Sequence, residues 1–211
     1  MRNKFFWRIS SLLIVTLIFL AFSFSKAFGA ESQISCRFPG LEDSKFSDDC
    51  AKISSDGSIT IKESAFKLIA FDHEHLASGS IGQMGCFWIN KKARIRKVFC
   101  FDNGADYFSD GFARFINEKN QFGFINKELN IVIPAIYDFA LPFERAFERA
   151  FDTAFEKTYA KVCMGCKIEH TKDSEHSTLS GGSWSLIDKS NKVLKVCPKD
   201  KSYLDCSFSS K

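Results

Sequence analysis

Two cysteines and two histidines in the C-terminal third have the clearest chemical potential in this sequence: Cys163, Cys166, His170 and His176. Thiolate sulfur and imidazole nitrogen are the usual ligands of tetrahedral zinc, and short chelating loops supply them at such spacings. A C-x-x-C pair also occurs in thiol redox proteins, but there it usually opens a helix in a βαβ unit. Haem attachment needs a histidine directly after the second cysteine, where this chain has Lys167. The favoured interpretation is a structural disulfide, either between Cys163 and Cys166 or from each to a C-terminal cysteine. A zinc site is the main alternative.

A second candidate metal cluster is the run Asp72-His73-Glu74-His75, in which two histidines lie two residues apart. In a β-strand they would share one face and could bind a metal ion together. The run is not the H-E-x-x-H signature of zinc proteases, because that signature separates its histidines by a helical turn. The sequence therefore favours a solvated loop at this position.

Other signatures of catalysis are absent from the sequence. It has no G-x-S-x-G nucleophile motif, no glycine-rich phosphate loop and no dinucleotide-binding fingerprint. No spacing of carboxylates singles out an acid–base pair, and all four histidines fall in loop-like segments or in an insertion. We therefore predict a non-enzymatic protein with no catalytic residue, no cofactor-binding residue and no bound metal.

The N-terminus has the pattern of an export signal. Basic residues within positions 2–8 precede the apolar run Ile9–Phe24, and small residues occupy much of 25–30. This pattern predicts a secretory signal peptide over residues 1–29, and hence a periplasmic or secreted protein. An uncleaved membrane anchor is the alternative, but the core of the run, Leu12–Phe22, is short for a membrane span. After cleavage we expect no stable membrane span.

Removing the predicted signal peptide makes the chain electrically neutral. The sequence has 29 Lys and Arg and 25 Asp and Glu, and residues 1–29 contain four basic residues and no acidic ones. The remaining chain carries 25 charges of each sign, which gives no electrostatic case for a nucleic-acid partner.

All eight cysteines follow the predicted signal peptide: Cys36, Cys50, Cys86, Cys100, Cys163, Cys166, Cys197 and Cys206. An even number in an exported chain indicates disulfides formed in an oxidising compartment. The favoured local pairs are Cys36–Cys50 and Cys86–Cys100, the second because it would join two strands of one predicted hairpin. Cys197 and Cys206 would tie down the C-terminal tail.

Strand-sized apolar runs separated by short polar turns occupy the centre of the chain. Between Tyr107 and Tyr137, apolar runs at 111–115, 122–125 and 131–133 alternate with turns rich in Asn, Lys and Glu. This arrangement predicts a three-stranded antiparallel meander.

The same stretch resembles the WG-repeat family, whose pattern is F-x-E-G-L-A-x-V, then G-K-W-G-[YF]-I-[DN], then V-I-P and Y-D. The segments that carry the resemblance are Phe108–Ala113, Phe122–Asn126, Val132–Pro134 and Tyr137-Asp138. The resemblance implies a tandem β-repeat scaffold, and the family is chiefly known without assigned chemistry.

A recurring isoleucine, at Ile89, Ile125 and Ile187, marks about three such units. The first interval is 36 residues, a plausible repeat period, and the second is 62 residues, so the third unit contains insertions. We place the insertions at 143–154 and 163–182.

The predicted fold is therefore all-β, with tandem antiparallel β-meander repeats of WG type over residues 85–196. Residues 30–84 form an irregular and β lead-in, with expected strands at Ser58–Lys62 and Ala65–Phe71, and residues 197–211 form a C-terminal tail.

One segment of the repeat domain has helical spacing. Phenylalanines recur at every fourth position from Phe143 to Phe155, with Glu and Arg between them. Side chains spaced by four lie on one helical face, so we predict a short amphipathic helix inserted around 142–157. Its apolar face could pack on the β core or bind a partner or a membrane, and the sequence favours packing.

These features predict an exported, non-enzymatic binding or scaffolding module for an unknown protein or envelope partner, because hairpin repeats expose long faces for recognition. The alternative is a zinc- or thiol-dependent role centred on Cys163, Cys166, His170 and His176. A third hypothesis is an envelope protein that keeps its N-terminal segment as an anchor.

Overall fold

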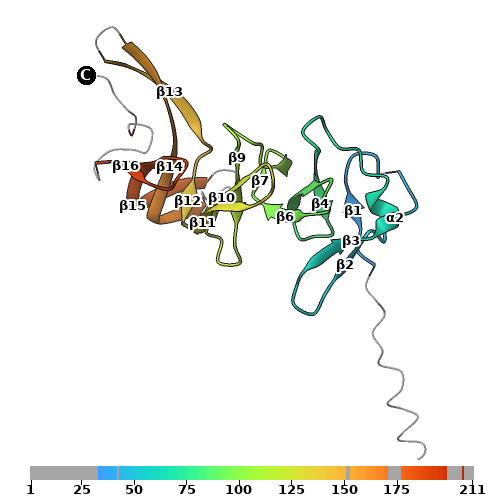
Figure 1. The fold of residues 1–211 in the computed structure, drawn as a ribbon. Coiled ribbons are helices and arrows are strands. Elements are labelled where there is room, and N and C mark those ends of the chain that lie inside the picture. The colour runs from blue at the N-terminus through green and yellow to red at the C-terminus, as the bar shows by residue number, and fades with distance from the viewer. Residues whose placement is uncertain (1–32, 42, 151–152, 171–176, 199–205, 207–211) are drawn as a thin grey trace, which may run out of the picture. The chain divides into compact units, whose positions relative to one another are not determined.

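The computed structural model describes residues 33–41, 43–150, 153–170, 177–198 and 206, and all its elements lie in one compact unit, Ile34–Lys211. Antiparallel strands make up the described elements, apart from the four-residue helix α2 (Glu63–Phe66). No helix among these residues is long and apolar enough to cross a membrane. The predicted all-β fold of hairpin strands is confirmed (Figure 1).

Three antiparallel sheets follow one another along the described chain. The first has the strand order β1 (Cys36–Arg37), β4 (Leu76–Ile81), β5 (Cys86–Asn90) and β6 (Ile95–Val98). The second has the order β11 (Ile131–Tyr137), β10 (Phe122–Asn126) and β9 (Phe112–Ile116). The third has the order β12 (Phe139–Ala140), β14 (Thr153–His170), β15 (Ser177–Ile187) and β16 (Val193–Val196), and β13 (Glu144–Ala150) also pairs with β14.

Two small hairpins lie outside these sheets: β2 (Ala51–Ile53) with β3 (Ile59–Ile61), and β7 (Cys100–Phe101) with β8 (Gly104–Ala105). Each of the three larger sheets contains one three-stranded meander, namely β4–β5–β6, β9–β10–β11 and β14–β15–β16. The first meander begins at Leu76, within the residues predicted to form the lead-in.

One turn geometry recurs through all three meanders. It starts at Asp or Asn, whose side-chain oxygen accepts a hydrogen bond from the N–H of the fifth residue, and its fourth residue has a positive φ. Asn and Asp favour such turns because their side chains replace a backbone acceptor. The turns start at Asp72, Asn90, Asn117, Asn126 and Asp188.

The three marker isoleucines occupy equivalent places in the meanders. Ile89, Ile125 and Ile187 are each 0% exposed, and each directly precedes one of these turns. The turn residue fixes where the hairpin ends, and the buried isoleucine fixes which face points to the core. The structure thus explains why isoleucine followed by Asn or Asp marks each unit.

Gly123 allows β10 and β11 to approach closely in the second meander. A Cβ at this position would lie 2.6 Å from the carbonyl oxygen of Ile133 and 2.7 Å from the nitrogen of Ala135. The register between the two strands shifts at the same place, between Phe122 and Phe124. A side chain at position 123 would therefore force the strands apart.

The expected strand at Ala65–Phe71 is wrong, because these residues contain the end of α2 and the turns that follow it. The N–H of Lys67 donates to the carbonyl of Glu63, and the two side chains form an ion pair one helical turn apart. Ala65 is the buried residue of the helix, and the ring centroids of Phe66 and Phe71 lie 5.6 Å apart. The expected strand at Ser58–Lys62 is confirmed as β3.

The amphipathic helix predicted around 142–157 is also wrong. Residues 144–150 form β13, which pairs in register with the start of β14, from Glu144 opposite Tyr159 to Ala150 opposite Thr153. A spacing of four fits a strand as well as a helix, because it is a multiple of the strand period of two. The buried residues Ala160 and Val162 fix β14 against the core, and β13 then pairs with it. Both predicted insertions therefore lengthen β hairpins.

A buried ion pair joins the meanders to one another. Asp106 and Arg114 side chains are 0% and 3% exposed, and Nη2 of Arg114 lies 2.5 Å from Oδ1 of Asp106. Nη1 of Arg114 donates to the carbonyl of Ala140, and Nε1 of Trp88 donates to the carbonyl of Asp106. Side chains and backbone from all three sheets, or from the segments that join them, thus meet at this pair.

A second charged contact joins the second and third meanders at Asp110, whose side chain is 8% exposed. Its carboxylate lies 2.6 Å from Nη2 of Arg145 and 2.6 Å from Nζ of Lys189. Burial alone would raise the pKa of Asp110, but hydrogen bonds from Lys189, Thr158 and Arg145 outweigh it and hold the pKa below the ordinary value of 3.8.

Asp110 should therefore contribute to stability in a pH-dependent way. A carboxyl group whose pKa is lower in the folded state stabilises the fold above its unfolded pKa, and this contribution is lost as the pH falls through its folded pKa. We expect Asp110→Asn to destabilise the protein at about pH 7, and the difference from the wild type to shrink at about pH 3. Urea unfolding at both pH values measures it, with the exposed Asp48→Asn as the control. A difference that does not change with pH would contradict the assignment.

Candidate functional site

The predicted chemical cluster is a disulfide in the structure. Cys163 and Cys166, both on β14, are bonded to each other, with a Cα–Cα distance of 6.0 Å. Gly182 on β15 lies against the bond, since a Cβ there would be 2.6 Å from each sulfur. Neither sulfur is a thiolate in this form, so the pair cannot serve as two zinc ligands.

The side chains of the two histidines of that cluster are not among the described side chains. His170 ends β14 but its side chain lies outside the described residues, as does His176. Among the described side chains, no group of three or more His, Cys, Asp and Glu is placed to hold a metal ion. The structure thus brings together the two cysteines and says nothing of the histidines.

The two local cysteine pairs expected from the sequence are confirmed, and the two cysteines of the C-terminal tail are bonded to each other. Disulfides join Cys36 to Cys50, Cys86 to Cys100, and Cys197 to Cys206. Cys86 lies on β5 and Cys100 on β7, just beyond β6, so this bond joins the β5–β6 hairpin to the short strand that follows it, and not the two strands of the hairpin as expected. The disulfides therefore tie both ends of the described unit.

The second candidate cluster, Asp72–His75, is one of the recurring turns. Oδ1 of Asp72 accepts hydrogen bonds from the N–H groups of Glu74 and Leu76, and His75 has a φ of 64°. Glu74 forms an ion pair with Lys127 in a turn of the second meander. Residues 72–75 are exposed, which confirms the solvated loop that the sequence favoured, and these contacts fix its conformation.

Phe143, the first residue of the candidate aromatic face, lies in the core. Its ring is 1% exposed and packs on the rings of Phe112 and Phe124, at 5.0 and 4.8 Å. It therefore cannot contribute to an exposed interface. The side chains of Phe147, Phe151 and Phe155 lie outside the described residues.

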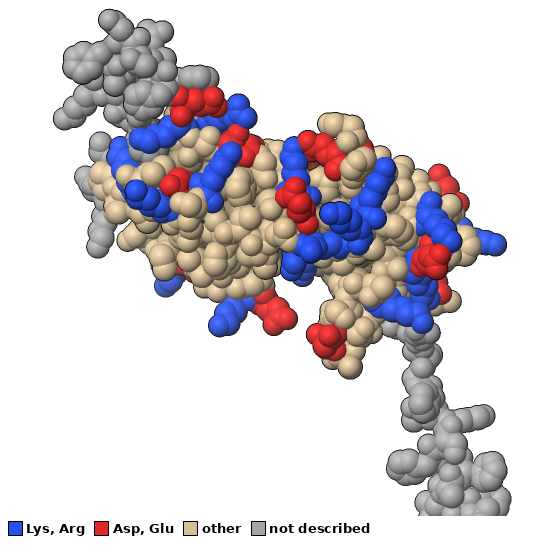
Figure 2. Space-filling model, in the orientation of Figure 1, with Lys and Arg blue, Asp and Glu red and all other residues tan. Residues whose placement is uncertain are grey.

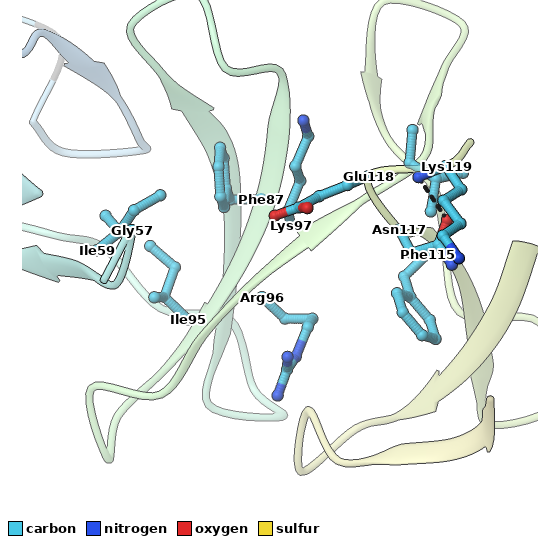
Figure 3. A pocket seen from close by; sticks show the side chains of 11 residues that line it. Gly57, Ile59, Phe87, Ile95, Arg96, Lys97, Phe115, Asn117, Glu118 and Lys119 are labelled. Atoms are coloured by element: carbon cyan, nitrogen blue, oxygen red, sulfur yellow. Dashed lines mark hydrogen bonds between the residues drawn. The ribbon is translucent and has the colours of Figure 1, made fainter. Parts of the chain in front are cut away.

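A groove that the sequence did not indicate opens between the first and second meanders (Figure 3). Its volume is about 530 Å³, within the usual range for ligand sites. Residues 95–97 of β6 form one side and residues 115–119, at the end of β9 and in the turn after it, form the other. Phe87 of β5 and two residues of the β2–β3 hairpin, Gly57 and Ile59, complete the lining.

The groove exists because β6 and β9 meet at one end and then separate. The N–H of Phe99, just after β6, donates to the carbonyl of Arg114 on β9 at 3.2 Å. The two strands nevertheless form no ladder in the described sheets. Beyond the Phe99–Arg114 bond, each strand therefore presents an outer edge to the groove.

The hairpin registers show which backbone groups lie on these edges. The N–H of Asn90 donates to the carbonyl of Arg94, so Asn90 and Arg94 are a hydrogen-bonded pair. Hydrogen-bonded and non-bonded pairs alternate along an antiparallel ladder, so the backbone groups of Arg96 and Val98 also bond to β5. The N–H and C=O groups of Ile95 and Lys97 then face away from β5, toward the groove. Asn117 and Gln121 are likewise a hydrogen-bonded pair, so the next pair, Ile116 and Phe122, is not. The backbone groups of Ile116 therefore lie on the outer edge of β9.

Basic side chains line the groove. Arg96, Lys97 and Lys119 are opposed there by one carboxylate, Glu118, and none of the four forms an ion pair with another described residue. Figure 2 shows Lys and Arg gathered over the region that β6 occupies in Figure 1. The groove therefore favours an anionic ligand.

Arg96 has an unsatisfied donor within this lining. Its Nε is buried and has no hydrogen-bond partner among the described residues. Burial, and after it the charge of Arg94, lower the pKa of the Arg96 guanidinium. A buried donor without an acceptor is uncommon in native proteins, and an acceptor on a ligand would satisfy it.

Sequence reasoning did not find the groove. A signal was present in the basic run Lys91–Lys97, which has five Lys or Arg in seven residues. The run became informative only when the structure placed part of it on a strand edge facing the second meander.

The comparison with known protein families agrees with the repeat seen in the fold. Residues 122–147 match the family model of the WG containing repeat, and they cover β10, β11, β12 and the start of β13. The chain contains a WG repeat. Within the matched residues, Gly123 allows the close approach of β10 and β11, and the other two meanders share the antiparallel order and the turn geometry of the second. Neither a curated protein nor a solved structure matches the chain.

Proposed function

We propose that this chain is an exported, non-enzymatic binding module whose ligand occupies the groove between the first and second meanders. The observation that carries the proposal is the set of unpartnered groups there. The outward backbone groups of Ile95, Lys97 and Ile116, the buried Nε of Arg96 and the side chain of Lys97 have no hydrogen-bond or ion-pair partner among the described residues. A ligand would supply the missing acceptors and donors.

The composition of the lining supports binding rather than a reaction. The groove is lined by Gly, Ile, Phe, Asn, Lys, Arg and Glu, and no Ser, Cys or His lies among these residues. Glu118 is the one carboxylate in the lining, and it has no nucleophile beside it to activate. Recognition therefore accounts for the groove better than catalysis.

Export is supported by the cysteines and the leader pattern. Four disulfides join all eight cysteines, which suits an oxidising compartment. The predicted signal peptide at residues 1–29 would deliver the chain there. A periplasmic or secreted partner protein, or an envelope component, is the expected ligand.

Site-specific photo-crosslinking in the exporting cell tests the proposal. Glu118 is replaced by p-benzoylphenylalanine, and Lys91 is replaced in the same way as the control. Both are second residues of the same type of turn, but Lys91 is exposed and lies outside the groove. We expect discrete adducts from position 118 that are absent from position 91. Identical adduct patterns from both positions would reject a ligand in the groove.

A further inference from the structure

We infer that the groove takes an extended, acidic peptide segment of a partner protein, which adds to the outer edge of β6 as a further strand. The inference rests on the proposed binding function and names the ligand of that same site. Three features carry it: the unpaired strand edges, the placement of the basic side chains, and the apolar walls.

The strand edges supply the main-chain recognition. An exposed sheet edge presents N–H and C=O groups at alternate residues, and an extended peptide can satisfy them as an added strand. On β6 these groups belong to Ile95 and Lys97, and Ile116 presents its own across the groove. If Phe99 and Arg114 are opposite each other in an antiparallel register, Lys97 lies opposite Ile116, two residues further along each strand. A peptide in the groove would therefore meet backbone partners on both sides.

The basic side chains specify acidic residues on the peptide. Successive side chains of a strand point to opposite faces, so Arg96 and Lys97 project to the two faces of the first sheet. Two consecutive acidic residues of an added strand would each lie beside one of them. The acidic residue beside Arg96 would also supply an acceptor near the buried Nε of Arg96.

The walls of the groove favour apolar residues next to the acidic pair. Ile59 and Ile95 are half-buried and leave apolar surface open in the groove, beside Phe87 and Phe115, which are 2% and 7% exposed. A β-branched residue on either side of the acidic pair would cover these surfaces and favour the extended conformation. Glu118 is the feature that opposes an acidic ligand, because its carboxylate shares the groove with the three cations.

A pair of short peptides provides the probe. One has Glu-Glu flanked by Val and Thr, and the matched peptide has Lys-Lys in place of the acidic pair. Binding to the mature protein, with its disulfides intact, is followed by NMR titration. We expect the acidic peptide to bind and the basic peptide to bind at least about tenfold more weakly, as for the loss of two charged contacts. Equal binding of the two peptides would overturn the inference.

Two variants at one position separate the strand edge from the charge. Lys97→Ala and Lys97→Pro both remove the ammonium group, but Lys97→Pro alone removes the N–H that faces the groove. Proline is tolerated at the outward position of an edge strand. We expect Lys97→Pro to bind the acidic peptide about two- to tenfold more weakly than Lys97→Ala, as for one hydrogen bond. Equal affinities would show that charge alone attracts the peptide and would overturn strand addition.

A third variant keeps the test valid if Lys97→Pro does not fold. Glu118→Gln removes the opposing carboxylate from an exposed turn, and it should strengthen binding of the acidic peptide severalfold. Unchanged or weaker binding would contradict the placement of the acidic pair. If position 118 crosslinks a ligand but the acidic peptide does not bind, this inference fails and the proposed function stands. If positions 118 and 91 crosslink alike, the proposed function fails as well.

Discussion

Asp106→Ala is expected to lower the free energy of unfolding by about 3–5 kcal/mol, because it leaves the buried guanidinium of Arg114 without its counter-ion. The carboxylate of Asp106 accepts hydrogen bonds from the backbone N–H, Nε and Nη2 of Arg114. The guanidinium carbon also lies 4.9 Å from the ring centroid of Phe99 and 5.5 Å from that of Phe101. Without the carboxylate, a positive charge would remain among these rings with one carbonyl partner.

Urea unfolding followed by tryptophan fluorescence measures this loss, with the exposed Asp48→Ala as the matched control. The double variant Asp106→Ala with Arg114→Met should be less destabilised than the sum of the two single variants, because it leaves no unpaired buried charge. A loss for Asp106→Ala within about 1 kcal/mol of the control would contradict the central place of the pair.

Phe143→Ala is expected to cost about 3–5 kcal/mol of folding free energy, as for truncation of a fully buried aromatic side chain. The Phe143 ring packs on Phe112 of β9 and Phe124 of β10. The backbone carbonyl of Phe143 accepts a hydrogen bond from the hydroxyl of Ser109. It therefore fastens the start of the β13–β14 hairpin to the second meander.

Denaturation of Phe143→Ala alongside Tyr107→Ala distinguishes a core role from an interface role. Tyr107 is 51% exposed, so its truncation should cost no more than about 1 kcal/mol. If Phe143 belonged to a partner-binding face, Phe143→Ala would leave stability unchanged and weaken binding instead. That outcome would contradict its place in the core.

The meanders and two of the cysteine pairs, Cys36–Cys50 and Cys86–Cys100, could be predicted because their signals are local. Four hairpins, β5–β6, β9–β10, β10–β11 and β15–β16, have an Asn or Asp turn between apolar strands, and the turn residue fixes the register of both flanking strands. Three of the four disulfides join cysteines only 9 to 14 residues apart, and the fourth spans a separation of 3. Short loops of this kind leave few ways to pair.

The errors arose where one pattern fits two structures. The fourfold spacing of phenylalanines suits a strand as well as a helix, and the pairing of β13 with β14 decided between them. At Ala65–Phe71, an apolar run read as a strand contains the end of a helix, and it finds no strand partner in the described sheets.

The groove was beyond sequence reasoning for a different reason. It depends on how β6 and β9 diverge, and the residues that set this divergence are far apart in the chain. Three features together fix where the strands meet: the Phe99–Arg114 hydrogen bond, the β7–β8 hairpin between the two strands, and the hydrogen bond from Arg114 to the carbonyl of Ala140. No local pattern records such a three-way contact.

Residue-resolved amide hydrogen exchange, with and without the acidic peptide, measures whether the outer edge of β6 is unpaired in the free protein and paired in the complex. In the protein alone, the N–H groups of Ile95 and Lys97 should exchange faster than those of Arg96 and Val98, because the latter pair with β5. Adding the peptide should slow exchange at Ile95, Lys97 and Ile116 and leave the β14–β15 ladder unchanged. Equal exchange along β6 in the free protein, or protection by the peptide outside the groove, would contradict the addition of a strand at β6.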